Sequence, residues 1–302
     1  MKNLTKDIRK AKQVAKILHS KFNSQEGIFG HNTMPEDLKP NTIKWGSEIS
    51  GASQYEYLMF ITMVVSIDYM RDANKLWESG RRTFDDTSTK WLFFPKEIVK
   101  HNIEDVKKSM QKYKLSKRPN KDTKIWFKVA ESLNNFYDGN PLNIVKEVNF
   151  DASKISNKKF DPTFKERFPY FAGRKIFPLW IRMLKDNINI NMKNLDKVPL
   201  PVDVHVSRST FTTGALKGEY NGNINNEIYN LIYEVWRAAI NQLNDSNLTY
   251  ALQLDEPLWH LSKYGCSKRK ELICPKQGDC PVGRFCVSGD IKITSGNISI
   301  KT

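Results

Sequence analysis

The sequence has little of several features that mark particular protein classes. Its 302 residues include only four cysteines, 13 prolines and 15 glycines, which excludes a dispersed disulfide scaffold, a collagen-like chain and a linker-dominated protein. The longest apolar stretch, Tyr57 to Ile67, is roughly half the length needed to span a bilayer. The amino terminus has neither the apolar core nor the small-residue cleavage site of a signal peptide. We therefore expect a soluble, cytoplasmic protein without a membrane partner.

Acidic residues are also scarce relative to basic ones. The chain carries 48 Lys and Arg against 33 Asp and Glu, a net charge of +15, while 39% hydrophobic residues and seven tryptophans indicate a folded core. An excess of this size predicts a polyanionic partner, nucleic acid first and an anionic membrane surface second. A codon bias toward lysine in an ordinary basic enzyme is the alternative. The stretch Lys107–Lys128 holds nine basic residues and one acid, which fits either a solvated helical face or a phosphate-contact surface.

Helical periodicity dominates the hydrophobic pattern. The stretch from Tyr57 to Trp77 predicts one long, mostly buried helix, with Ser53 as N-cap and Glu56 completing a capping box. Strand-like alternation is confined to two short stretches near the carboxyl end, Ile291–Ile293 and Ile298–Ile300. Helical spacing also occurs in Met1–Lys21, Ile125–Tyr137 and Ile224–Leu243. The predicted fold class is therefore all-α.

Two segments suggest a specific chemistry. In Phe168-Pro-Tyr-Phe-Ala-Gly-Arg-Lys175, a helix is expected to end near Phe168 and a new one to run from Lys175 to Leu184. A tight glycine-containing turn between two helices can direct backbone N–H groups at a phosphate. In Val202-Asp-Val-His-Val-Ser-Arg208, Asp203 opens a helix, where the helix dipole favours a carboxylate.

These segments, in this order, resemble the helix-hairpin-helix DNA glycosylases, the superfamily of endonuclease III and the 8-oxoguanine glycosylases. Gly173-Arg174-Lys175 matches the end of the family hairpin L-P-G-V-G-R-K, and Val202–Arg208 matches the V-D-T/S-H/R-V-x-R stretch. The resemblance extends from about residue 50 onward. It implies an enzyme that flips a damaged or modified base out of duplex DNA and excises it.

The resemblance also implies roles for individual residues. Lys175 would be the nucleophile that forms a Schiff base and permits strand cleavage, and Asp203 the carboxylate that stabilises positive charge on the sugar. Two other readings stay open: a monofunctional glycosylase that uses Asp203 only, and a non-catalytic DNA-binding protein that keeps the fold. The predicted DNA contacts are Tyr170, Phe171, Gly173, Arg174, His205 and Arg208.

The four cysteines Cys266, Cys274, Cys280 and Cys286 lie within 21 residues. A tight cluster in a reducing compartment indicates metal binding, and endonuclease III relatives hold a 4Fe–4S cluster in a loop at this place. Four thiolates also suit zinc, which is the alternative. The basic residues around the loop suit a DNA-backbone contact: Lys263, Lys268, Arg269, Lys270, Lys276 and Arg284.

The sequence departs from the family pattern in several places. Phe171 replaces the first hairpin glycine, and Val204 replaces the hydroxyl residue of the second motif. Lys175 and Asp203 are 28 residues apart, which is longer than in endonuclease III and closer to the archaeal 8-oxoguanine glycosylases. The cysteine spacing is C-x7-C-x5-C-x5-C rather than the familiar C-x6-C-x2-C-x5-C. The chain is therefore expected to be a divergent relative whose target base stays open.

The resemblance implies a two-lobed monomer that grips duplex DNA between its lobes. The first lobe, residues 51–199, would be a six-helix barrel that includes the hairpin, 164–184. The second would be a discontinuous helical lobe that pairs residues 1–50 with 200–302 and carries the cysteine loop, 266–286.

Overall fold

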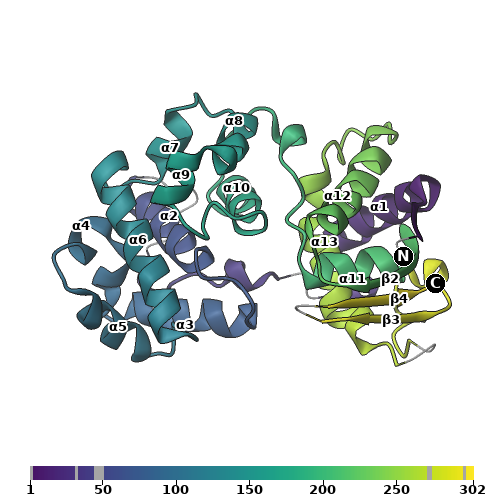
Figure 1. Cartoon of the computed structure of the whole chain (residues 1–302), viewed down its shortest axis with the longest axis horizontal. Coiled ribbons are helices and arrows are strands. Elements are labelled where there is room, and N and C mark those ends of the chain that lie inside the picture. The colour runs from purple at the N-terminus through teal and green to yellow at the C-terminus, as the bar shows by residue number, and fades with distance from the viewer. Residues whose placement is uncertain (1–2, 31–32, 44–50, 271–273, 295–296) are drawn as a thin grey trace. The chain divides into compact units, whose positions relative to one another are not determined.

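The computed structural model describes residues 3–30, 33–43, 51–270, 274–294 and 297–302. The described chain is mostly helical, with 58% helix in 13 α-helices, and it contains a small antiparallel sheet of four strands. It folds as two compact units, and Figure 1 labels the elements of each. The central unit comprises Met34–Val198, and the terminal unit combines Met1–Thr33 with Pro199–Thr302.

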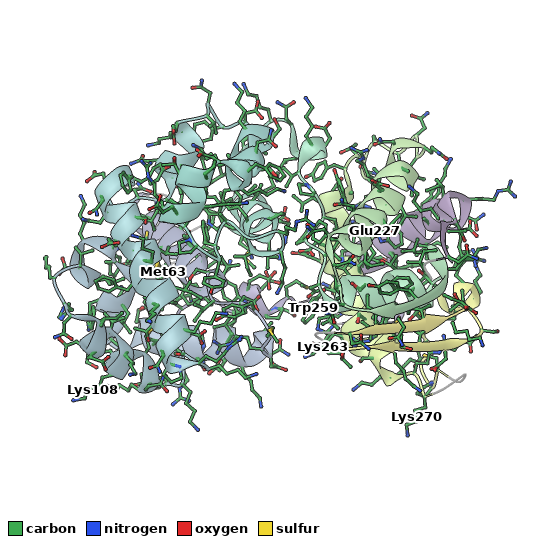
Figure 2. The ribbon with its side chains drawn as sticks, viewed as in Figure 1. Met63, Lys108, Glu227, Trp259, Lys263 and Lys270 are labelled. Atoms are coloured by element: carbon green, nitrogen blue, oxygen red, sulfur yellow. The ribbon has the colours of Figure 1, made fainter. Side chains whose placement is uncertain are left out.

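The central unit contains nine of the described α-helices. They are α2 (Gly51–Val65), α3 (Ala73–Asp85), α4 (Pro95–Ile98), α5 (Ile103–Gln111), α6 (Pro119–Tyr137), α7 (Leu142–Lys146), α8 (Ala152–Asn157), α9 (Pro162–Arg167) and α10 (Ile176–Asp186). Helix α2 is the core element, because every side chain from Tyr57 to Val65 is buried. Met63 of α2 lies inside the unit, whereas Lys108 of α5 points away from it (Figure 2).

Aromatic side chains fill much of this core. The ring of Phe60 on α2 contacts the rings of Trp77, Phe84 and Phe93 with centroid distances of 5.6 to 5.8 Å. Trp180 of α10 donates a hydrogen bond of 3.0 Å from its indole N–H to the hydroxyl of Thr62. Aromatic pairs of this kind add to the stabilisation by area burial alone.

The single helix predicted for Tyr57–Trp77 is wrong, because the structure breaks it into α2 and α3. The chain leaves the helix after Val65, Met70 adopts a left-handed φ of 50°, and Asp72 caps α3 by accepting from the backbone N–H of Lys75. Ser53 lies inside α2, which begins at Gly51, so the predicted N-cap is also wrong. Apolar periodicity continues across the break and therefore hides it.

Residues 34–43, expected in the second lobe, belong to the central unit. Glu36 is buried there and forms an ion pair with the buried guanidinium of Arg182 on α10. A buried charge requires such a partner, so this pair fixes the segment to the helices. The remaining residues up to 50 lie outside the described ranges.

The terminal unit is built from four α-helices and the sheet. Its elements are β1 (Asn3–Lys6), α1 (Ile8–Asn23), α11 (Val204–Thr212), β2 (Leu216–Gly222), α12 (Asn226–Asn241), α13 (Asp255–His260), β3 (Asp290–Ile293) and β4 (Ile298–Lys301). The strand order is β1-β2-β4-β3, all antiparallel, and strands β2 and β3 lie beside α11 (Figure 1). The predicted strands at the carboxyl end are confirmed as β3 and β4.

The sheet corrects the all-α expectation. Strand β1 (NLTK) is mostly exposed. Strand β2 (LKGEYNG) alternates in burial, but it has only two large apolar side chains, Leu216 and Tyr220, so its sequence shows the alternation weakly. Their pairing is long-range, with Asn3 opposite Glu219 and Glu219 opposite Lys301. Local periodicity cannot reveal a sheet that joins both ends of the chain.

The amphipathic helices of the terminal unit are confirmed. Helix α1 buries Ala11, Val14, Ala15, Leu18 and Phe22, as its spacing predicts. The buried indole N–H of Trp236 on α12 donates to the hydroxyl of Thr210, 2.8 Å away on α11. In the part of the chain that the structure describes, no helix combines the length and apolar character needed to cross a membrane.

Candidate functional site

The turn between α9 and α10 places Lys175 at the start of a helix. Helix α9 ends at Arg167, and Lys175 is the N-cap of α10. Within the turn, the N–H of Gly173 donates to the carbonyl of Tyr170 at 3.0 Å, and a Cβ at Gly173 would lie only 2.7 Å from that oxygen. The close approach requires glycine at this position. Two helices joined by a short turn are thus present where the sequence predicts them.

Lys175 is held by a residue that the sequence analysis did not identify. Its ammonium donates to the backbone carbonyl of Asp68 at 3.0 Å, and Nζ lies 3.8 Å from Oδ2 of the same residue. Asp68 is buried and lies in the segment between α2 and α3. The break in the predicted long helix therefore supplies the carboxylate beside the lysine. A lone acid at the end of an apolar run was the available sequence signal.

The aromatic residues of the turn face different environments. Phe171 is fully buried, and its ring contacts the rings of Phe168, Phe177 and Trp180. Tyr170 is 53% exposed and adopts a left-handed φ of 65°. The side chain of Phe171 is thus part of the core, and Tyr170 is the one that faces solvent.

A second lysine lies close to the turn. Lys159 is buried, and this burial, together with the smaller effect of the positive charge of Arg174, lowers its pKa to about 8. Its ammonium lies 5.1 Å from the ring centroid of Phe160. Arg174 itself is exposed. The turn therefore combines an exposed guanidinium with a buried amine whose charged form is disfavoured.

Asp203 is in the terminal unit and caps α11. Its Oδ1 accepts from the backbone N–H groups of His205 at 2.7 Å and Val206 at 2.9 Å. This N-cap is the ordinary structural role of an aspartate before a helix. The hydrogen bonds fix the carboxylate at the helix N-terminus, half-exposed. The sequence correctly predicts its place in the secondary structure.

His205 and Arg208 both contact Ser262. The Nδ1 atom of His205 lies 3.1 Å from the Ser262 hydroxyl oxygen, and Arg208 donates to that oxygen at 3.0 Å and to the carbonyl of Ile293 at 2.7 Å. The His205 ring also lies 5.2 Å from that of Trp259. These contacts hold α11 against the segment after α13 and against β3. Burial lowers the pKa of Arg208 from its usual value.

The four cysteines are unpaired and close enough to influence one another. Burial raises the pKa of the Cys266 thiol, and the other three sulfurs raise it further. Burial also raises the pKa of Cys280 to about 11 and that of Cys286 above its usual value. Within the described ranges, no three His, Cys, Asp or Glu side chains converge as metal ligands. The donor set nevertheless fits a metal that accepts four thiolates, because gathered thiolates need a cation to offset their repulsion.

The predicted basic surface at the cysteine loop is present in the described residues. Lys268, Lys270, Lys276 and Arg284 are exposed. A pocket of about 280 Å³ lies beside Cys266 and is lined also by Arg208, Arg269 and Lys292. Several cations thus lie at the surface of the terminal unit next to the thiols.

The predicted site residues are divided between the two units. Tyr170, Phe171, Gly173, Arg174 and Lys175 lie in the central unit, and Asp203, His205, Arg208 and the cysteines lie in the terminal unit. Within the terminal unit, Arg208 lies close enough to Asp203 and Cys266 for their ionised forms to raise its pKa, against the larger lowering by burial. Among known proteins, neither a family model nor a curated sequence matches this chain.

Proposed function

We propose that the protein is a DNA glycosylase that also cleaves the strand at the resulting abasic site. The observation that carries the proposal is the position of Lys175, a half-buried amine at a helix–turn–helix junction with the Asp68 carboxylate 3.8 Å away. A primary amine in such a place can act as a nucleophile once its proton is removed. The Asp68 carboxylate lies beside this amine and could accept that proton.

The proposed reaction begins when a bond forms between Nζ of Lys175 and C1′ of the sugar and the bond from C1′ to the base breaks. The neutral Nζ of Lys175 attacks C1′, the bond from C1′ to the base breaks, and the base leaves with the bonding electrons and takes up a proton. Proton transfer to the ring oxygen then opens the sugar and leaves a protonated imine between Nζ and C1′. Removal of a proton from C2′ expels the 3′ phosphate and cleaves the strand.

Asp203 would stabilise the positive charge that develops on the sugar as the base departs. The backbone N–H groups of His205 and Val206 hold its Oδ1, so the carboxylate is oriented before substrate arrives. Such preorganisation is what makes a fixed charge effective in a transition state. His205 and Arg208 would position α11 through Ser262 and contribute contacts to phosphates.

The hairpin turn would contact the DNA backbone. Arg174 and Tyr170 are exposed, and Gly173 permits the tight turn between them and α10. Phosphate contacts from arginine, lysine and backbone N–H groups position duplex DNA without reading its sequence. A damaged or modified base would then be extruded, which costs a few kcal/mol and least for a mispaired base.

The cysteine loop would hold a 4Fe–4S cluster through Cys266, Cys274, Cys280 and Cys286, with zinc as the alternative. The bound metal would supply a fixed crosslink of the loop and take no part in base excision. The residues around it would present Lys268, Lys270 and Arg284 to DNA phosphates. A brown protein with absorbance near 400 nm would support iron–sulfur, and a colourless protein with stoichiometric zinc would support the alternative.

Borohydride trapping tests the proposed activity. Duplexes that each carry one modified base are incubated with the protein and borohydride, which reduces the imine to a stable covalent adduct. We expect an adduct and base release with at least one duplex. Lys175→Gln should abolish the adduct, and Asp203→Asn should slow base release at least about a hundredfold. Lys165→Gln, an exposed lysine of α9, is the matched control.

The contact with Asp68 also supports a second candidate, a monofunctional glycosylase. A carboxylate close to an amine favours the ammonium form, in which Lys175 would bind phosphate and not attack the sugar. Base release without any trapped adduct would establish this alternative. A non-catalytic DNA-binding protein is the third reading, and wild-type DNA binding with no base release from any duplex would favour it.

A further inference from the structure

A pocket in the central unit is lined by Tyr170 but not by Lys175. Its volume is about 570 Å³, within the range of small-molecule sites, and it lies between the first turns of α6 and the turn before α10. Lys121, Lys124 and Lys128 line it together with Ile125, Pro169 and Tyr170. The lining therefore combines three ammonium groups with an apolar and aromatic surface.

The charge of this pocket is only partly neutralised. Lys128 forms an ion pair of 2.7 Å with Glu131, whereas Lys121 and Lys124 are exposed and form no ion pair with any described carboxylate. The nearest other acid, Asp122, is buried. Lys121 and Lys124 are three residues apart on α6 and so lie on the same helical face. Lys124 is therefore an unneutralised cation at the pocket rim, and the Lys121 ammonium lies 4.5 Å from the ring centroid of Tyr170 and 5.1 Å from that of Tyr69.

The aromatic residue of the pocket, Tyr170, is held in place by its neighbours. The rings of Tyr170 and Tyr69 are nearly parallel, at 12° with centroids 6.1 Å apart, and the Tyr69 hydroxyl donates to the buried Asp122 at 2.9 Å. The Arg118 guanidinium lies 4.2 Å from the Tyr69 ring centroid. Tyr170 thus belongs to a fixed stack, although a bulky residue with positive φ is unfavourable in isolation. Strain that the surrounding contacts maintain is typical of a functional position.

We propose that this pocket binds an unpaired nucleotide of single-stranded DNA. The base would stack on Tyr170 and contact Pro169 and Ile125, and the adjoining phosphates would pair with Lys121 and Lys124. Stacking on an aromatic side chain beside a cationic groove is the general mode by which proteins bind single strands without reading sequence. The proposal rests on the proposed function only in taking DNA as the polymer.

The first test measures the binding of a short fluorescein-labelled oligothymidylate to the full-length protein by anisotropy. The double variant Lys121→Gln/Lys124→Gln should bind at least about fivefold more weakly. Its salt dependence should also fall by a slope of about 1.4, because single strands contribute about 0.7 per phosphate contact. The control Lys146→Gln/Lys165→Gln removes the same charge from exposed lysines outside the pocket. Equal weakening in both double variants would overturn the proposal, since bulk charge would then explain binding.

The second test locates the base directly. An oligonucleotide with 5-iodo-deoxyuridine is irradiated on the Lys175→Gln protein, and the crosslinked peptide is sequenced. We expect the adduct on Tyr170, and an adduct on a peptide outside 120–128 and 169–170 would overturn the proposal. Because Lys175 is replaced in this protein, the crosslink does not depend on the proposed Schiff-base chemistry. Loss of base release with an adduct retained on Tyr170 would separate the subsite from the catalytic proposal.

Discussion

Replacing Lys159 with methionine should stabilise the protein at neutral pH. Burial lowers the pKa of this lysine from 10.5 to about 8, so the folded state disfavours the charge that the unfolded chain carries freely. A shift of this size corresponds to about 3 kcal/mol at pH 7. Methionine has a similar length and no charge, but it forfeits the cation–π contact with Phe160, worth about 1 kcal/mol. We therefore expect Lys159→Met to gain about 2 kcal/mol at pH 7.

The pH dependence of this gain identifies its cause. The folded-state pKa of Lys159 is lower than the unfolded one, so the unfolded chain binds more protons between pH 8 and pH 10.5. The stability of the wild type therefore rises with pH in that window, and the advantage of the variant shrinks. Urea unfolding of both proteins at pH 7 and pH 9.5 should show the gain falling by about 2 kcal/mol.

Two results would refute this reasoning. A gain that is the same at pH 7 and pH 9.5 would mean that packing and not charge determines the effect. A destabilised Lys159→Met protein at pH 7 would mean that the ammonium has a stabilising partner. The second variant, Arg174→Gln, removes the neighbouring positive charge. It should be more stable than the wild type at pH 7, by a smaller amount than Lys159→Met.

Three further predictions concern the cores and the thiols. Asp122→Ala should destabilise the protein by about 3 kcal/mol in urea unfolding, because it leaves the N–H groups of Lys117 and Arg118 without their acceptor; a loss below about 1 kcal/mol would contradict the buried role. Phe60→Ala should cost about 3–5 kcal/mol by the same measurement, since the ring is fully buried among other rings, and a cost typical of a surface site would disprove that packing. Cys266→Ala should lower the bound iron or zinc measured by elemental analysis and lower the thermal midpoint, whereas unchanged metal content would exclude this thiol as a ligand.

The features that could be predicted from the sequence are those that depend on neighbouring residues. Helix α1 follows its apolar spacing, and Asp203 precedes α11 as an N-cap does. The alternating isoleucines correctly indicate β3 and β4. In each case the residues that determine the element lie within a few positions of one another, so the local pattern is sufficient.

The features that were missed depend on contacts between distant residues. The partner strands β1 and β2 pair across more than 200 residues, as Leu4 with Gly218 shows. Lys175 can be named from its place after Gly173, but its contact with Asp68 spans 107 residues. The turn that presents Asp68 lies within an apolar periodicity that continues from α2 into α3. A local pattern cannot show where a buried helix stops if the residues after the break are also apolar.

Two buried acids in the central unit are turned inward and do not neutralise the exposed lysines near the turn before α10. Asp68 and Asp122 are both buried, and they hold Lys175, Tyr69 and the chain before α6 from the inside. The exposed lysines nearby, Lys121 and Lys124, form no ion pair with any described carboxylate. The salt dependence of DNA binding reflects the number of phosphates contacted and not the total charge. We therefore expect a slope set by the few exposed cations near the turn and the cysteine loop, far smaller than 15 phosphate contacts would give.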